Sequence, residues 1–161
     1  MKSSTSTQAR KRPPHARGSA EQHRRTRQAR AGELAQDYVE VIDDLIAECG
    51  EARVVDIAKR LGVTHVTVTR TVSRLQKQGL VRAERYRSIF LSDEGKKLAM
   101  WVRRRHKVVL EFLLALGIDE QIARVDAEGI EHHVSDATVR AFTRFCERKR
   151  GAAKRVRSSR R

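Results

Sequence analysis

Residues 54–91 have the sequence VVDIAKRLGVTHVTVTRTVSRLQKQGLVRAERYRSIFL. Apolar side chains at helical spacing predict one helix from Val54 to Leu61 and another from about His65 to Gln78. Between them, Gly62 allows the left-handed turn that a short connection needs, and Thr64 is suited to cap the second helix. This order of elements predicts a helix-turn-helix.

The second of these helices has one apolar face and one basic face. Val68, Val72 and Leu75 recur at i, i+4 and i+7 and are expected to point inward. The opposite face is suited to enter the major groove of DNA, N-terminus first. Val66 and Arg70 are expected to contact bases, and Thr67 a base or a phosphate. Arg74 and Lys77 are expected to contact phosphates.

After Gly79, the chain is typical of two short strands around a tight turn. Arg85 and Arg87 flank the tip of this hairpin. A basic hairpin directly after a recognition helix predicts a wing that contacts the DNA backbone or the minor groove. The alternative is a three-helix bundle whose hairpin has no role in DNA binding.

Helices are also predicted on both sides of this segment. Apolar residues at helical spacing predict a first helix that begins near Leu34 and is stopped by Gly50. A long helix is expected from about Asp93 to Leu116, and its apolar surface is larger than one small core needs, so a symmetric homodimer would bury it. That surface consists of Leu98, Trp101, Val102, Val109, Leu110, Phe112, Leu113 and Leu116.

The net charge of +15 over 161 residues is unevenly distributed. Residues 1–33 and 148–161 carry all of the excess, and residues 34–147 are neutral. Within that neutral body, residues 34–52 hold six acidic and no basic side chains, whereas residues 53–87 hold nine basic and two acidic ones. The acidic and basic stretches indicate two different partners, a cation and DNA, although ordinary solvated faces are the alternative.

Composition excludes several classes of protein. No apolar run approaches the roughly 18 residues that span a bilayer, so no membrane partner is expected. The two cysteines, Cys49 and Cys146, are too few for a small secreted disulfide scaffold, and a cytoplasmic location is expected. Residues 1–33 and 148–161 hold too little apolar surface to fold and are predicted to be disordered basic tails.

Carboxylates and histidines recur at helical spacing in three predicted helices. Asp37 and Glu40 are three residues apart in the first helix, and His106 lies in the long helix. Further along, Glu128, Glu131 and His132 fall at i, i+3 and i+4, which places them on one helix face. Together they could supply one or two metal ions.

Three runs of this chain resemble the manganese-responsive members of the diphtheria-toxin-repressor family of metal-dependent transcription factors. The runs are QDYVEVIDDLIAECGEARVVDIAKRLGV, KQGLVRAERYRSIFLSDEGKKLA and DAEGIEHHVS, and the likeness covers roughly residues 34–147. The resemblance implies a mostly α protein with a winged helix-turn-helix domain (residues 34–92) and a helical dimerisation and metal-binding domain (residues 93–147). It implies a regulator rather than an enzyme, with double-stranded operator DNA as its partner.

The same resemblance implies the ligand set and the metal. The ligands would be Asp37, Glu40, His106, Glu128, Glu131 and His132. Iron-responsive relatives have methionine in place of Asp37 and cysteine in place of Glu128, and carboxylates at both positions favour Mn(II). Fe(II) and other divalent ions could also bind in vitro. The implied activity is repression of manganese uptake genes, or activation of efflux genes.

Two other functions stay open from the residues alone. One is a winged-helix protein that binds DNA without metal, in which the acidic and histidine residues form only a polar helix interface. The other is a carboxylate-bridged metalloenzyme. Helical di-iron enzymes use two Glu-x-x-His pairs, and this chain has Glu128-x-x-Glu131-His132 only once.

Overall fold

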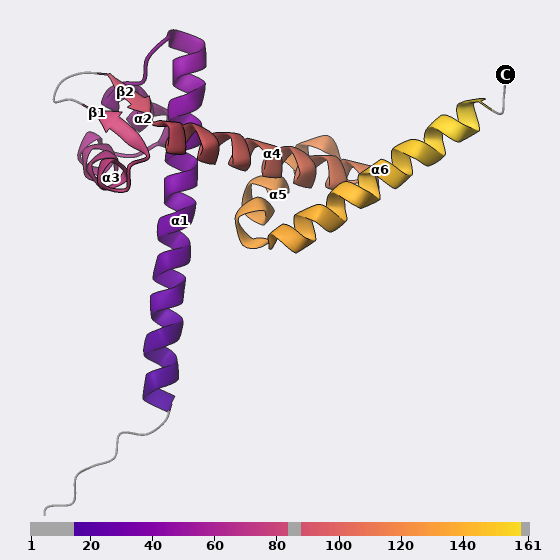
Figure 1. Cartoon of the computed structure of the whole chain (residues 1–161), viewed down its shortest axis with the longest axis horizontal. Coiled ribbons are helices and arrows are strands. Elements are labelled where there is room, and N and C mark those ends of the chain that lie inside the picture. Colours follow the sequence, from indigo (N-terminus) through magenta and orange to yellow (C-terminus); the bar gives the residue numbers. More distant parts are fainter. Residues whose placement is uncertain (1–14, 84–87, 159–161) are drawn as a thin grey trace, which may run out of the picture. The chain divides into compact units, whose positions relative to one another are not determined.

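The computed structural model describes residues 15–83 and 88–158, with side chains described for residues 20–83 and 88–152 (Figure 1). It divides into two units, residues 1–34 and 35–161, and each is considered by itself. Helices account for most of the described chain, as predicted. The elements are α1 (His15–Cys49), α2 (Val54–Leu61), α3 (His65–Lys77), β1 (Val81–Ala83), β2 (Ile89–Leu91), α4 (Asp93–Leu116), α5 (Glu120–His133) and α6 (Asp136–Ser158).

Helices α2 and α3 form the predicted helix-turn-helix. Gly62 ends α2 in the left-handed region, with φ of 65°. Thr64 caps α3, because its side-chain oxygen accepts a hydrogen bond from the backbone N–H of Thr67 at 3.2 Å. The inner face of α3 is buried at Val68, Val72 and Leu75, as expected from their spacing.

The two strands form an antiparallel hairpin, as predicted. Val81 pairs with Leu91, and Ala83 pairs with Ile89. A further bridge joins Ile89 to Ala52, whose carbonyl oxygen accepts a hydrogen bond from the Ile89 N–H at 2.7 Å. The tip, with the predicted DNA contacts Arg85 and Arg87, lies outside the described residues.

Helix α4 begins against the hairpin at a point where only glycine fits. The Ser92 side chain accepts a hydrogen bond from the Gly95 N–H at 3.0 Å and donates one to the carbonyl oxygen of Gly79. A Cβ atom on Gly95 would overlap the carbonyl oxygen of Leu80. The first turn of α4 is therefore packed directly on the backbone of the winged-helix domain.

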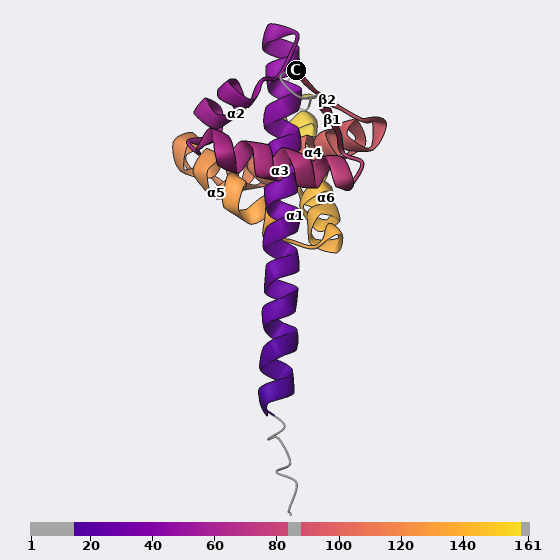
Figure 2. The same ribbon diagram turned by 90° about the vertical axis from the view of Figure 1, so that its left-hand side faces the viewer.

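Helices α5 and α6 both pack against α4, and Figure 2 shows them on its two sides. Their core is centred on Val109 and Leu113 of α4 with Ala123 and Ala127 of α5. The rings of Phe112 and Phe142 stack over it at 3.9 Å between centroids. Part of the surface expected to form a dimer contact, including Val102, Val109 and Leu113, is therefore buried within the subunit.

The helices extend into both predicted tails. Helix α1 begins at His15 and α6 ends at Ser158, so residues 15–33 and 148–158 are helical rather than disordered. Both stretches continue a helix that already exists, and extension of a helix needs no new nucleus. The domain boundaries remain predictions. No helix in the described part of the chain is both long and apolar enough to cross a membrane.

We predict that Gly95→Ala lowers the free energy of unfolding by about 3 kcal/mol, because the added methyl group must displace the backbone at Leu80. The matched control is Gly129→Ala in α5, where nothing lies within 4 Å of the new Cβ. That variant should gain roughly 0.5–1 kcal/mol from helix propensity. Urea unfolding of the metal-free proteins, followed by circular dichroism, measures both. Equal stability of the two variants would contradict this packing.

Candidate metal centre and recognition helix

The six residues expected to bind metal lie on three helices of the second unit. Helix α1 carries Asp37 and Glu40, and α4 carries His106. Helix α5 carries the other three, which are Glu128, Glu131 and His132. Contacts given below bring five of the six into direct proximity, and electrostatic interactions connect Glu40 to the same cluster. Glu128, Glu131 and His132 lie on one helix, as their i, i+3, i+4 spacing predicted.

His106 links α4 to two carboxylates of α5. Its Nδ1 atom is hydrogen-bonded to Oε2 of Glu131 at 2.7 Å and lies 3.6 Å from Oε1 of Glu128. Glu131 is 1% exposed, whereas the Glu128 side chain is 68% exposed. The cluster therefore has a buried side at Glu131 and an open side at Glu128.

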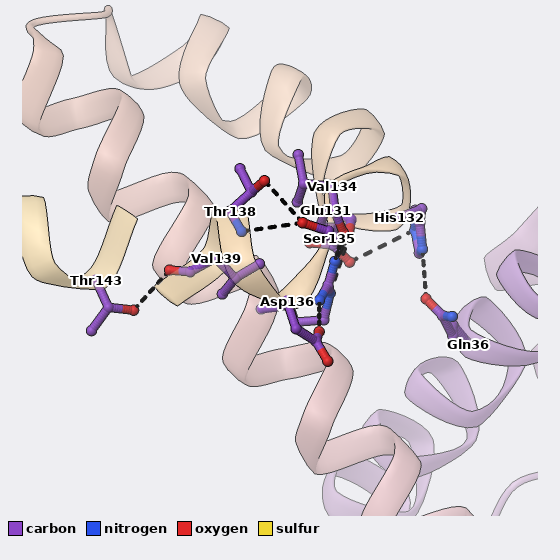
Figure 3. Close-up of polar contacts among 10 residues, drawn as sticks. Gln36, Glu131, His132, Val134, Ser135, Asp136, Thr138, Val139 and Thr143 are labelled. Atoms are coloured by element: carbon purple, nitrogen blue, oxygen red, sulfur yellow. Dashed lines mark hydrogen bonds and ion pairs between the residues drawn. The ribbon is translucent and has the colours of Figure 1, made fainter. Parts of the chain in front are cut away.

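His132 links α5 to α1. Its Nε2 atom lies 3.4 Å from Oδ1 of Asp37 and 3.7 Å from Oε1 of Glu131. The Nδ1 atom is 2.9 Å from the side-chain oxygen of Gln36, as Figure 3 shows. Gln36 was not predicted, and the only signal for it is its position directly before Asp37. Its amide holds the imidazole with Nε2 directed at the carboxylates.

Burial and mutual repulsion make the negative charge of the carboxylates in this cluster unfavourable. The pKa of Glu131 is raised to about 7: desolvation is the main cause, His106 lowers the pKa, and the nearby carboxylates of Glu40 and Glu128 raise it. The pKa of Glu40 is also raised, first by burial and then by Glu128 and Asp44. Carboxylates in this state favour a bound cation.

One buried oxygen supports a cation directly. Oε1 of Glu131 is buried and has no hydrogen-bond partner among the described residues. Within the same residues, no three His, Cys, Asp or Glu side chains are arranged to enclose an ion as they stand. Carboxylate oxygens with imidazole nitrogens suit a hard or borderline divalent ion. The residues present therefore fit a metal.

Arg105 is a second residue that sequence reasoning missed. It ends the basic run Arg103–Arg105, in which exposed side chains would be expected, yet it is 6% exposed. Its guanidinium donates hydrogen bonds to the carbonyl oxygens of Glu131 and Val134. The signal that could have found it is helix phase, because it lies three residues after Val102 and four before Val109, which are both buried.

The outer face of α3 is exposed as predicted. Val66 is 60% exposed, and Arg70, Arg74 and Lys77 are exposed as well. Thr67 is exposed too, but its hydroxyl lies 3.0 Å from that of Thr64, so it also takes part in the N-terminal cap. In the described part of the chain, no acidic side chain pairs with these three basic residues. This face can therefore meet phosphates and base edges.

Two family models match consecutive parts of the chain. Residues 31–89 match the N-terminal DNA binding domain of the iron dependent repressor, and residues 92–150 match its metal binding and dimerisation domain. Transcriptional regulator MntR of Escherichia coli O6:H1 is 52% identical over 125 residues, which is 78% of this chain and 81% of that protein. HTH-type transcriptional regulator MntR of Bacillus subtilis is 43% identical over 100 residues, or 62% of this chain and 70% of that one.

Solved structures show the same likeness. A manganese-dependent transcriptional repressor in complex with manganese is 30% identical with a TM-score of 0.62, over 70% of this chain and 52% of that one. The manganese regulator SloR is 26% identical with a TM-score of 0.62, and the match covers 70% of this chain and 53% of that one. This chain spans about half the length of those two proteins. With a DNA-binding domain followed by a metal-binding and dimerisation domain, the chain belongs to the iron dependent repressor family of metal-dependent transcriptional regulators.

Proposed function

We propose that this chain is a Mn(II)-dependent homodimeric regulator that acts in the cytoplasm on double-stranded operator DNA. Metal binding joins the DNA-binding and dimerisation domains and raises operator affinity. The regulated genes are those of manganese uptake, which it represses, with activation of efflux genes as the second possibility.

The observation that carries this proposal is the sharing of Glu131 between two histidines. Glu131 is buried, its carboxylate reaches His106 of α4, and it lies beside His132, which in turn meets Asp37 of α1. Helix α1 leads directly into the helix-turn-helix. A cation held in this cluster therefore bonds the DNA-binding domain to the helices that follow it.

The proposed ligands are Asp37, Glu40, His106, Glu128, Glu131 and His132. When bound, the metal would supply two positive charges to a cluster with four carboxylates. Without it, burial and repulsion raise the pKa of Glu131 and Glu40, and separation of the helices would relieve that repulsion. The metal thus favours the arrangement in which α1, α4 and α5 stay together.

Manganese is the metal that the donor set and the relatives favour. Oxygen donors at positions 37 and 128 suit Mn(II). The relatives at about half identity are named transcriptional regulator MntR, and two similar solved structures are a manganese regulator and a manganese-dependent repressor by title. Fe(II), Co(II) or Zn(II) would compete in vitro, because affinity at such sites generally rises along the first-row series. The family consists of regulators of transcription, so the metalloenzyme alternative has no support.

DNA binding would use the outer face of α3, with the wing residues Arg85 and Arg87 on the backbone or minor groove. A homodimer would place two such helices about 34–36 Å apart, or a multiple of that distance, along the duplex. Apolar side chains left exposed on α4 and α5 provide surface for that dimer; they are Trp101, Leu114, Leu116, Ile122 and Val125. Metal would select the conformations in which the spacing is met.

The direct test is an operator titration at fixed salt. An operator is first selected from random duplexes in Mn(II), and its affinity is then measured in Mn(II) and in EDTA. We expect affinity to be roughly 5–150-fold higher with Mn(II), the usual range of coupling between two sites. Equal affinity in both buffers would contradict the proposal and support metal-independent DNA binding.

Glu131→Gln separates metal binding from folding. The variant should bind Mn(II) at least about tenfold more weakly, because an amide is a poorer ligand than a carboxylate. The raised pKa means that folded Glu131 holds its proton up to about pH 7, so in the metal-free wild type this group lowers stability as pH rises from roughly 4.5 to 7. Glu131→Gln should remove that part of the pH dependence, as followed by thermal unfolding. Unchanged Mn(II) affinity would exclude Glu131 as a ligand.

The recognition helix is tested by two substitutions with different expected signatures. Arg70→Ala should cost about 1–3 kcal/mol on the operator and relax base preference at one position of each half-site. Lys77→Ala should weaken binding to all sequences and reduce the slope of log affinity against log salt by about one per site. Binding-site selection and salt titrations distinguish them. If Arg70→Ala retains full base preference, its assignment to a base is wrong.

A further inference from the structure

We propose that Arg105 is a positioning residue for the metal centre: it holds the main chain of Glu131 so that the Glu131 carboxylate meets His106. This inference rests on the proposed function. Arg105 and His106 are neighbours on α4, and they contact the two ends of the same residue. The guanidinium of Arg105 donates to the carbonyl oxygen of Glu131, and the imidazole of His106 is hydrogen-bonded to the Glu131 carboxylate.

The contacts of Arg105 use the whole guanidinium. Its Nε and Nη2 atoms donate to the carbonyl oxygen of Glu131 at 3.2 and 2.7 Å, and Nη2 also donates to that of Val134. Nη1 bonds Oδ1 of Asp136 at 2.6 Å, in the first turn of α6. The ring of Trp101 lies 4.5 Å from the guanidinium carbon. One side chain thus ties the end of α5 to both α4 and α6.

The hydrogen bonds of Arg105 lie at the C-terminal end of α5, next to the proposed ligands. Carbonyl groups in the last turn of a helix have no partner within that helix, so the end of α5 depends on outside donors for its position. Glu131 and His132 lie in this last turn, and Figure 3 shows Glu131, His132 and Val134 within the same short stretch. A shift of the turn would move both proposed ligands relative to His106.

The planar fork of arginine is what the site requires. The Nε and Nη2 donors of the planar guanidinium converge on one carbonyl oxygen and define its direction. The ammonium of lysine instead has three rotatable donors on a flexible stem, so it does not fix that direction. Groups that orient metal ligands typically change metal affinity by about 10–100-fold when they are lost. The exposed ion pair with Asp136, whose side chain is 62% exposed, should matter much less for the metal.

The experiment compares Mn(II) dissociation constants of the full-length protein and four variants, by calorimetry at a temperature where circular dichroism shows each to be folded. Arg105→Lys removes the fork. Arg105→Met keeps the volume over Trp101 but no donor, and it guards against loss of folding, since well-packed apolar replacements of buried charges are often tolerated. The controls are Arg104→Lys, an exposed neighbour, and Asp136→Asn, which keeps the bonds to the carbonyl groups.

We expect Arg105→Lys and Arg105→Met to bind Mn(II) about tenfold more weakly or worse, with both controls within twofold of the wild type. A purely structural role would instead lower the melting temperature of the metal-free protein and leave Mn(II) affinity unchanged, which would overturn the inference. Equal losses for Asp136→Asn and Arg105→Lys would also overturn it, since the α6 contact would then be responsible. If the wild type itself fails to bind Mn(II), the proposed function falls together with this inference.

Discussion

Glu131 lies buried where α1, α4 and α5 meet. One of its carboxylate oxygens is hydrogen-bonded to His106, and the other has no hydrogen-bond partner among the residues that the structure describes. A carboxylate in such a place is costly unless it is protonated, paired with a positive charge or bound to a metal. The pKa of Glu131 is raised although the His106 imidazole lowers it, so His106 offsets only part of this cost. The packing of the three helices around it therefore depends on how that charge is balanced.

This dependence explains how one ion could control DNA binding by residues that lie elsewhere in the chain. Asp37 and Glu40 belong to the helix that enters the winged-helix domain, and Ser92 and Gly95 pack the start of α4 on the same domain. The proposed metal cluster and the α4 junction are thus two connections between the same two domains. Under the proposed function, bound metal stabilises the second connection. Arg105 would keep the α5 side of that connection in place.

Local features of the fold could be predicted well from the sequence. The Gly62 turn, the Thr64 cap and the alternation of faces on α3 follow from neighbouring residues and were confirmed. The shared helix of the proposed α5 ligands follows from helix periodicity, but their contact with Asp37 is a long-range contact that only the family resemblance implied. Arg105 was missed because a charged residue in a basic run is usually exposed, and its burial is set by carbonyl groups at the end of another helix.

The central claim is that metal and operator binding are coupled through one conformation, and reciprocity tests it most directly. Mn(II) affinity is measured by calorimetry for the protein alone and for the protein saturated with operator DNA. The account predicts that DNA tightens Mn(II) binding by the same factor by which Mn(II) tightens DNA binding, because the coupling free energy is shared. Mn(II) affinity that is identical with and without operator would contradict it.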